Sequence, residues 1–118
     1  MKNLISMFVL SILSVAAYGQ TDVIGIWNTG DQNTLVEIQE ENGKYVGKVL
    51  SSDNPKVKEG TLILKDILFK KGTCEGKVYA PRRGEWYDTT LEKQNGTLKL
   101  EVSLGFFNKT IEWRAEKV

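Results

Sequence analysis

Few residues of this chain belong to the types that carry out catalysis. The sequence has no histidine and a single cysteine, Cys74. The lack of histidine removes Ser-His-Asp and Cys-His arrangements and every His-based zinc site. No acidic pair has glycosidase placement, no Gly-rich loop precedes a helix to hold phosphate, and Asp31 and Asp53 lack the spacing of a calcium site. We therefore expect no catalytic residue, no metal site, no cofactor and no enzymatic activity. Two close carboxylates with shifted pKa values in a cleft would be evidence for an enzyme instead.

Aromatic and hydroxyl side chains are the better candidates for a binding site. Residues 86–90 form the most polar and aromatic segment, Trp-Tyr-Asp-Thr-Thr. If Leu91 faces inward on a strand, Tyr87 and Thr89 do too. They would then either line a cavity or lie at a wet barrel end with their hydroxyls bonded to backbone. The candidate ligand-binding residues are Trp27, Tyr45, Tyr79, Tyr87, Thr89 and Phe106.

Two turns carry side chains that suit binding. Phe106 and Phe107 stand between Gly105 and Asn108, where a turn is expected. Two adjacent aromatics here could form a ligand portal, a docking patch or a membrane-touching tip. The favoured expectation is that at least one ring folds over the end of the barrel. Arg82 and Arg83 follow Pro81 and would either grip an anionic ligand or form a solvated hairpin tip.

The N-terminal segment is typical of a secretory signal peptide. Lys2 precedes an apolar run from Leu4 to Ala17, and cleavage after Gly19 is predicted. We expect residues 1–19 to be removed and residues 20–118 to form one exported domain, periplasmic or extracellular. No second apolar stretch is long enough for a transmembrane segment.

Charge and cysteine content narrow the partners. The chain has 16 basic and 15 acidic residues, and loss of Lys2 with the signal would balance them. This balance, without a basic run, predicts no nucleic-acid binding. A lone cysteine forms no intrachain disulfide, so Cys74 is either a buried apolar filler or free to react or pair between chains.

The elements that must position these residues are short strands. Leu98, Leu100, Val102 and Leu104 alternate with polar residues, as on a half-buried strand. Asn42-Gly43 and Asn95-Gly96 are hairpin turn signals. Further strands are expected at 23–28, 36–39, 45–50, 62–69 (with a break near Lys65-Asp66), 76–80, 86–91 and 110–114. The fold class is therefore all-β, a sandwich or, preferably, a small antiparallel up-and-down β-barrel of about eight strands.

An ordered series of short motifs covers nearly the whole predicted domain. The series is Gly25-Ile26-Trp27, Asp31, residues 36–38, 42–49 and 53–55, Gly76 to Pro81, Gly84 with Tyr87, residues 98–100, and Gly105-Phe106 leading to Trp113. It resembles the domain-of-unknown-function family 2147, small exported bacterial proteins. The resemblance implies a calycin-like, lipocalin-type barrel and no established activity.

The chain departs from that family pattern at two places. Similar proteins usually have tryptophan at the position of Cys74 and arginine at the position of Ala115. Here Arg114 follows Trp113 directly. Neighbours on a strand point to opposite faces, so stacking of this arginine on Trp27 is not expected.

Two functions follow as hypotheses. The first is non-enzymatic binding of a small apolar ligand in the barrel mouth, based on the resemblance and on the aromatic set above. The alternative is an interaction module of the cell envelope that binds another exported protein through the Phe106-Phe107 turn or an outer sheet face.

Overall fold

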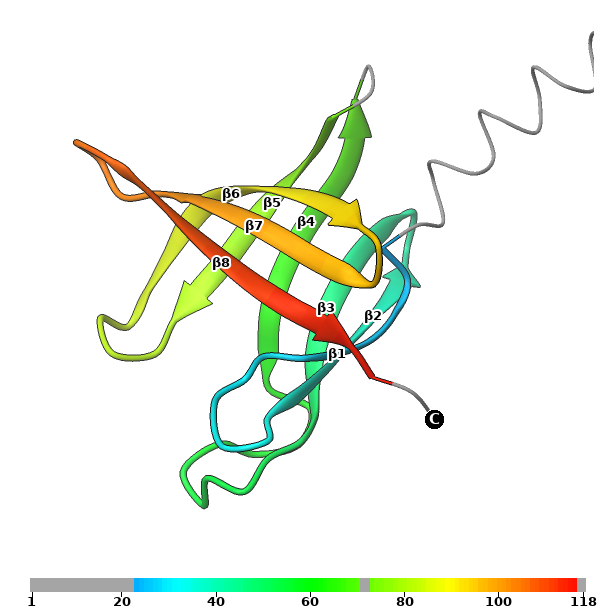
Figure 1. Ribbon diagram of the computed structural model, residues 1–118, viewed down its shortest axis with the longest axis vertical. Helices are drawn as coiled ribbons and strands as arrows, with labels where there is room; N and C mark the ends of the chain where they lie inside the picture. The colour runs from blue at the N-terminus through cyan, green and yellow to red at the C-terminus, as the bar shows by residue number, and fades with distance from the viewer. Residues whose placement is uncertain (1–22, 71–72, 117–118) are drawn as a thin grey trace, which may run out of the picture.

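The computed structural model describes residues 23–70 and 73–116, which form a closed antiparallel barrel. The predicted signal peptide and the ends of the predicted domain lie outside the described residues. Each strand pairs with the next along the chain, and β8 pairs back with β1 (Figure 1). The strands are β1 (Gly25–Asn28), β2 (Leu35–Glu41), β3 (Lys44–Ser51), β4 (Leu62–Lys70), β5 (Thr73–Ala80), β6 (Glu85–Gln94), β7 (Thr97–Ser103) and β8 (Asn108–Ala115). The predicted all-β barrel of about eight strands is confirmed, and the described residues include no helix long and apolar enough to cross a membrane.

Turn chemistry explains the tight connections. Asn42-Gly43 and Asn95-Gly96 both have positive φ at each residue, as the turn of a two-residue hairpin requires. These are the turns between β2 and β3 and between β6 and β7. A side chain with a short polar group tolerates this conformation at the first position, and glycine adopts it at no steric cost at the second.

The expected break in the fourth strand is a β-bulge within a continuous strand. Asp66 has a φ of 54°, and the pairing of β4 with β5 shifts register between Lys65 and Leu68. Because one residue is added, Leu64 and Ile67 both remain fully buried although they are three positions apart. The bulge turns the carboxylate of Asp66 to the exposed side of the sheet.

The barrel interior is filled by apolar side chains. The largest fully buried ones are Val36, Ile38, Leu64, Ile67, Leu98 and Leu100. Trp27 and Trp113 are also buried, and Trp27 Nε1 donates a hydrogen bond to the Val23 carbonyl at 3.0 Å. Among the described residues, every buried side-chain nitrogen or oxygen has a hydrogen-bond partner. The interior therefore presents no unsatisfied polar group.

Two residues singled out by the family pattern occupy defined places. Cys74 is a buried free thiol in the core, which supports its interpretation as an apolar filler. Arg114 is exposed and pairs with Asn28, whereas Trp27 is buried beside Ala115 in the register. The arginine and the Trp27 ring thus lie on opposite faces of the barrel wall, as expected.

Candidate functional site

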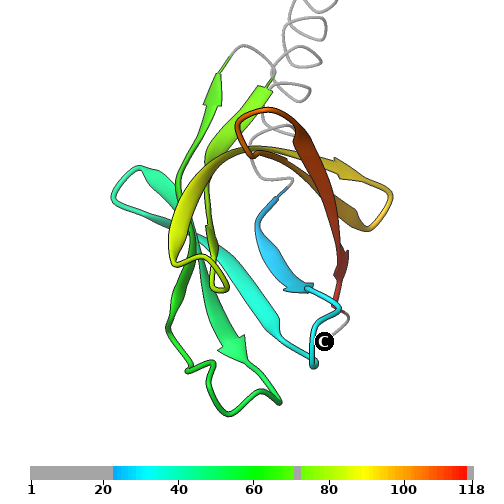
Figure 2. The same ribbon diagram turned by 90° about the vertical axis from the view of Figure 1, so that its left-hand side faces the viewer.

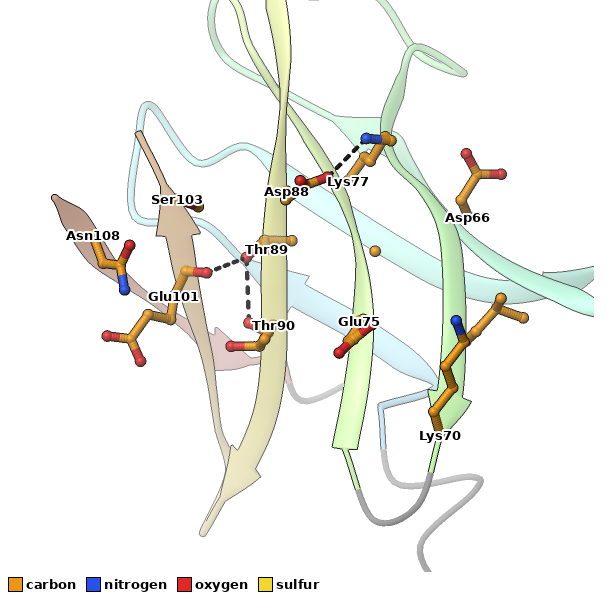
Figure 3. Close-up of a pocket in the computed structure, with 12 residues that line it drawn as sticks. Asp66, Lys70, Glu75, Lys77, Asp88, Thr89, Thr90, Glu101, Ser103 and Asn108 are labelled. Carbon is orange, nitrogen blue, oxygen red and sulfur yellow. Dashed lines mark hydrogen bonds and ion pairs between the residues drawn. The ribbon is translucent and has the colours of Figure 1, made fainter. Parts of the chain in front are cut away.

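A polar hollow lies across the outer face of strands β4 to β8. Its volume is about 560 Å³. Outward-facing side chains of five neighbouring strands line it, because alternate residues of each strand point away from the core. Figure 3 shows the charged, hydroxyl and amide groups that line it, including Lys70 of β4, Glu75 of β5, Thr90 of β6, Glu101 of β7 and Asn108 of β8.

One ion pair lies in the lining of the hollow. Lys77 on β5 lies opposite Asp88 on β6 in the register, and Nζ is 2.7 Å from Oδ1. The hydrogen bond from Lys77 to Asp88 and the negative charge of that carboxylate raise the pKa of Lys77. At the rim, Lys44 reaches Asp66, the bulge residue, at 3.5 Å. These exposed pairs set the pattern of charge and add little to stability.

The hollow carries more negative than positive charge. Its lining contains Asp66, Glu75, Asp88 and Glu101 against Lys70 and Lys77. Lys77 is already paired with Asp88. Glu75 and Glu101, which also line the hollow, make no ion pair among the described residues. The described residues contain no group of three or more His, Cys, Asp or Glu placed to hold a metal ion. The surface is therefore suited to a partner with positive charge.

An aromatic patch lies on the same outer face. Tyr79 and Trp86 are register partners on β5 and β6, with ring centroids 5.2 Å apart. Lys65 Nζ lies 4.2 Å from the centroid of the Trp86 ring. This cation–π contact covers one ring face and holds a positive charge beside the acidic hollow.

The tip of the β7–β8 hairpin is apolar and fully open to solvent. Phe106 has a relative exposure of 104% and Phe107 of 59%. Gly105 has a φ of 94°, and Leu104 N donates to the Phe107 carbonyl at 2.9 Å, so the turn is tight and holds both rings outward. The expectation that at least one ring folds over the barrel end is wrong, because a turn this short cannot bring either ring back to the core. Ser103 and Asn108, which flank the tip, belong to the lining of the hollow.

The structure brings three of the six predicted ligand-binding residues to one apolar core. Trp27 belongs to it, and half-buried Tyr45 and Tyr87 pack against it. Tyr45 makes an edge-to-face contact with Phe69, with ring centroids 5.5 Å apart. The Tyr87 hydroxyl donates to Glu85 Oε2 at 2.8 Å and accepts a 3.5 Å contact from Arg83.

The other three predicted residues do not join that set of rings. Thr89 is buried, and its hydroxyl donates to the Glu101 carbonyl at 3.0 Å, so backbone satisfies it. Tyr79 lies on the outer face and Phe106 at the hairpin tip. Arg82 and Arg83 are exposed in the β5–β6 turn. A ligand site built from all six residues stays a prediction.

The sequence pointed to an outer sheet face as a possible binding surface but did not identify the residues of the hollow. A signal was present in the alternation of Asp88 and Thr90 with the inward residues Tyr87, Thr89 and Leu91. The same period places Glu75 and Glu101 outward on the neighbouring strands. The register that aligns Thr90 with both Glu75 and Glu101 could not be read from one sequence.

Comparison with known families agrees with the motif series. Residues 25–115 match the family model described as "Uncharacterized protein conserved in bacteria (DUF2147)". The chain belongs to this family. The match covers β1 through β8, so the DUF2147 region and the barrel coincide. The predicted family is confirmed, while the calycin-like relationship stays a prediction. No curated protein and no solved structure matches the chain.

Proposed function

We propose that this DUF2147 protein is an exported interaction module that binds another protein through the β7–β8 hairpin tip and the adjoining hollow. The observation that carries the proposal is the pair of exposed rings, Phe106 and Phe107, on a tight turn. Burying one such ring on a partner contributes roughly 1.5–3 kcal/mol. Exposed aromatics beside a polar surface are typical of protein–protein contacts.

The chemistry of the hollow supports a partner of defined charge. Glu75 and Glu101 line it, and one of its two lysines, Lys77, is paired with Asp88. A partner segment with an apolar group for the tip and lysine or arginine beside it is complementary to both features. Export rests on the predicted signal peptide, with Lys2 before the apolar run from Leu4 to Ala17.

Photo-crosslinking in the native host tests this function. A benzoylphenylalanine at position 106 replaces one exposed ring with a reactive one, and we expect a discrete adduct with an envelope protein. The control carries the same group at position 56, an exposed residue of the β3–β4 loop. Identical adduct patterns at both positions would reject the hairpin tip as the binding surface.

A matched pair of substitutions separates binding from folding. Phe106→Ser removes the exposed ring and should abolish the adduct formed from position 107 while leaving the melting temperature unchanged. Leu50→Ser makes the same kind of change at another exposed apolar residue on β3. It should leave the adduct intact. Equal loss in both variants would mean that general surface hydrophobicity, rather than the tip, drives the contact.

Binding of a small apolar ligand is the second candidate function. It is supported by the half-buried rings of Tyr45 and Phe69, which meet edge to face beside the core. A ligand seated there would replace solvent against both rings. Native mass spectrometry of the exported protein should then find a species of a few hundred daltons that denaturation releases, and a clean unliganded protein would count against this candidate.

A further inference from the structure

The seam that closes the barrel is much shorter than its strands. β1 has four residues and β8 has eight, and the register joins only Trp27 with Ala115 and Asn28 with Arg114. Figure 2 shows β1 (blue) meeting β8 (red) only near the C-terminal end of β8. Within residues 23–70 and 73–116, no strand pairs with the β1 side of β8 between Asn108 and Glu112. We call this stretch the free edge of β8.

Two backbone hydrogen bonds near the end of β8 identify the backbone groups on this edge. Ala115 N donates to the Gly96 carbonyl at 2.8 Å, so residue 115 turns its backbone groups toward β7. Glu116 N donates to the Ile26 carbonyl at 2.9 Å, so residue 116 turns its groups toward β1. Because direction alternates along a strand, Asn108, Thr110 and Glu112 present their N–H and C=O groups to the free edge.

A free edge of this kind is a template for another strand. We propose that the free edge of β8 pairs with the same edge of a second copy of this chain, forming an antiparallel dimer about a two-fold axis. Identical edges can pair in this way because an isologous contact places residue i against residue j and j against i. The pairing uses the backbone edge of β8, which begins beside the hairpin tip, and it does not rest on the hairpin-tip function proposed above.

The side chains of the free edge are complementary to themselves in one register. With the axis at Thr110, this residue lies opposite its own copy, and Asn108 lies opposite Glu112. All three direct their backbone groups to the edge, so the strands would exchange about six backbone hydrogen bonds. On the other face, Lys109 lies opposite Ile111 and can lay its aliphatic stem along that side chain.

Charge and exposure favour this register. It opposes no like charges, and the Asn108 amide can donate to the Glu112 carboxylate. Asn108, Lys109, Thr110 and Glu112 are all exposed in one copy, so no side chain must leave the core for the strands to meet. Phe107 precedes Asn108 directly, and the pairing brings this exposed ring alongside the far end of the other β8.

Proline at the centre of the edge tests the dimer. Thr110→Pro removes an N–H that points away from β7, so the barrel keeps its own ladder, as proline on an edge strand allows. Thr110→Val keeps the N–H. Sedimentation equilibrium of the exported protein should show a dimer for the wild type and Thr110→Val, and a dissociation constant weakened at least about tenfold for Thr110→Pro. A monomeric wild type, or equal association of both variants, would overturn the proposal.

Disulfide trapping tests the register without proline. In a Cys74→Ala background, Thr110→Cys places one thiol on the axis, and mild oxidation should yield a covalent dimer that reduction dissolves. Thr90→Cys is the control, since residue 90 is also exposed on the outer face but lies on β6, inside the sheet. Absence of a Thr110→Cys dimer, or equal trapping at residue 90, would overturn the register. Neither variant alters Phe106 or Phe107, so failure here leaves the hairpin-tip function to its own test.

Discussion

Cys74 shows how burial removes the reactivity of a thiol. The side chain belongs to the core and lies opposite Phe69 in the register. Burial, together with the negative charge of Glu75, raises the pKa of the thiol from 9.0 to about 11. The thiolate is the nucleophile and the neutral thiol is not. Packing in the core therefore keeps Cys74 as an unreactive neutral thiol in the folded protein.

We predict that Cys74 resists alkylation in the folded protein. At pH 8, the thiol lies far below its pKa of about 11 and is shielded by neighbouring side chains. Iodoacetamide should leave the native mass unchanged and add one group after denaturation. Mass spectrometry of samples quenched at intervals measures both rates. Equal rates in the native and denatured protein would contradict the buried position.

The same pKa shift predicts the direction of a pH effect on stability. The folded pKa of about 11 lies above the ordinary 9.0, so the folded state keeps a proton that the unfolded state releases. This contribution is complete below about pH 9 and is lost as the pH rises toward 11, by roughly 2 kcal/mol. Urea titrations across that range should show a steeper decline for the wild type than for Cys74→Ala, which lacks the group. Parallel declines would refute the shift.

At the scale of the strands, two glycines let the wall pass close to large side chains. Gly76 on β5 faces the bulge of β4, and a Cβ there would lie 2.9 Å from Ile67 Cγ1 and 3.1 Å from the Lys65 carbonyl. Gly47 on β3 has Leu64 Cβ at 3.0 Å from the same position. Neither glycine has a positive φ, so the backbone conformation does not require glycine at these positions. Glycine is required because a side chain would collide with the neighbouring strand.

We predict that Gly76→Ala destabilises the barrel by about 1–3 kcal/mol, because the added methyl group forces Ile67 or the bulge backbone to move. Chemical denaturation monitored by tryptophan fluorescence measures the change. Glu75→Ala is the matched control on the adjacent exposed position, and it should alter stability by less than about 0.5 kcal/mol. Similar effects of the two substitutions would mean that the close approach at Gly76 relaxes freely.

The elements were predictable from the sequence where one face is apolar and turns are explicit. The alternation of Leu98, Leu100 and Val102 placed β7 to within one residue at each end, because water and core select opposite faces. The sequence predicted the bulge at Asp66 only as a break in the strand. Two polar residues in an apolar run do not show whether a strand ends there or bends. The outward Phe106 and the outer hollow depend on register and turn geometry, which a single sequence does not contain.

At the scale of the whole molecule, closure is uneven around the barrel. Seven hairpin connections join consecutive strands, whereas β1 and β8 are far apart in the chain and share two register pairs. In contrast, β5 and β6 share six consecutive pairs from Glu75–Thr90 to Ala80–Glu85. A barrel of this kind removes most exposed edges and leaves the remainder at the seam. The free edge of β8 therefore adjoins the β1–β8 pairing, which has only two register pairs.

Uneven closure predicts that the seam opens before the rest of the barrel. Opening it breaks a few hydrogen bonds and uncovers Trp27 and Trp113, whereas separating β5 from β6 disrupts a long ladder. In the Thr110→Pro variant, where no second copy is expected to cover the edge, NMR hydrogen exchange should be faster for the Asn28 and Arg114 amides than for those of Val78 and Tyr87. The wild-type amides at the seam should exchange more slowly than those of the variant if the dimer forms. Equal protection at the seam and in β5–β6 would show that closure is uniformly cooperative, because local opening would then require global unfolding.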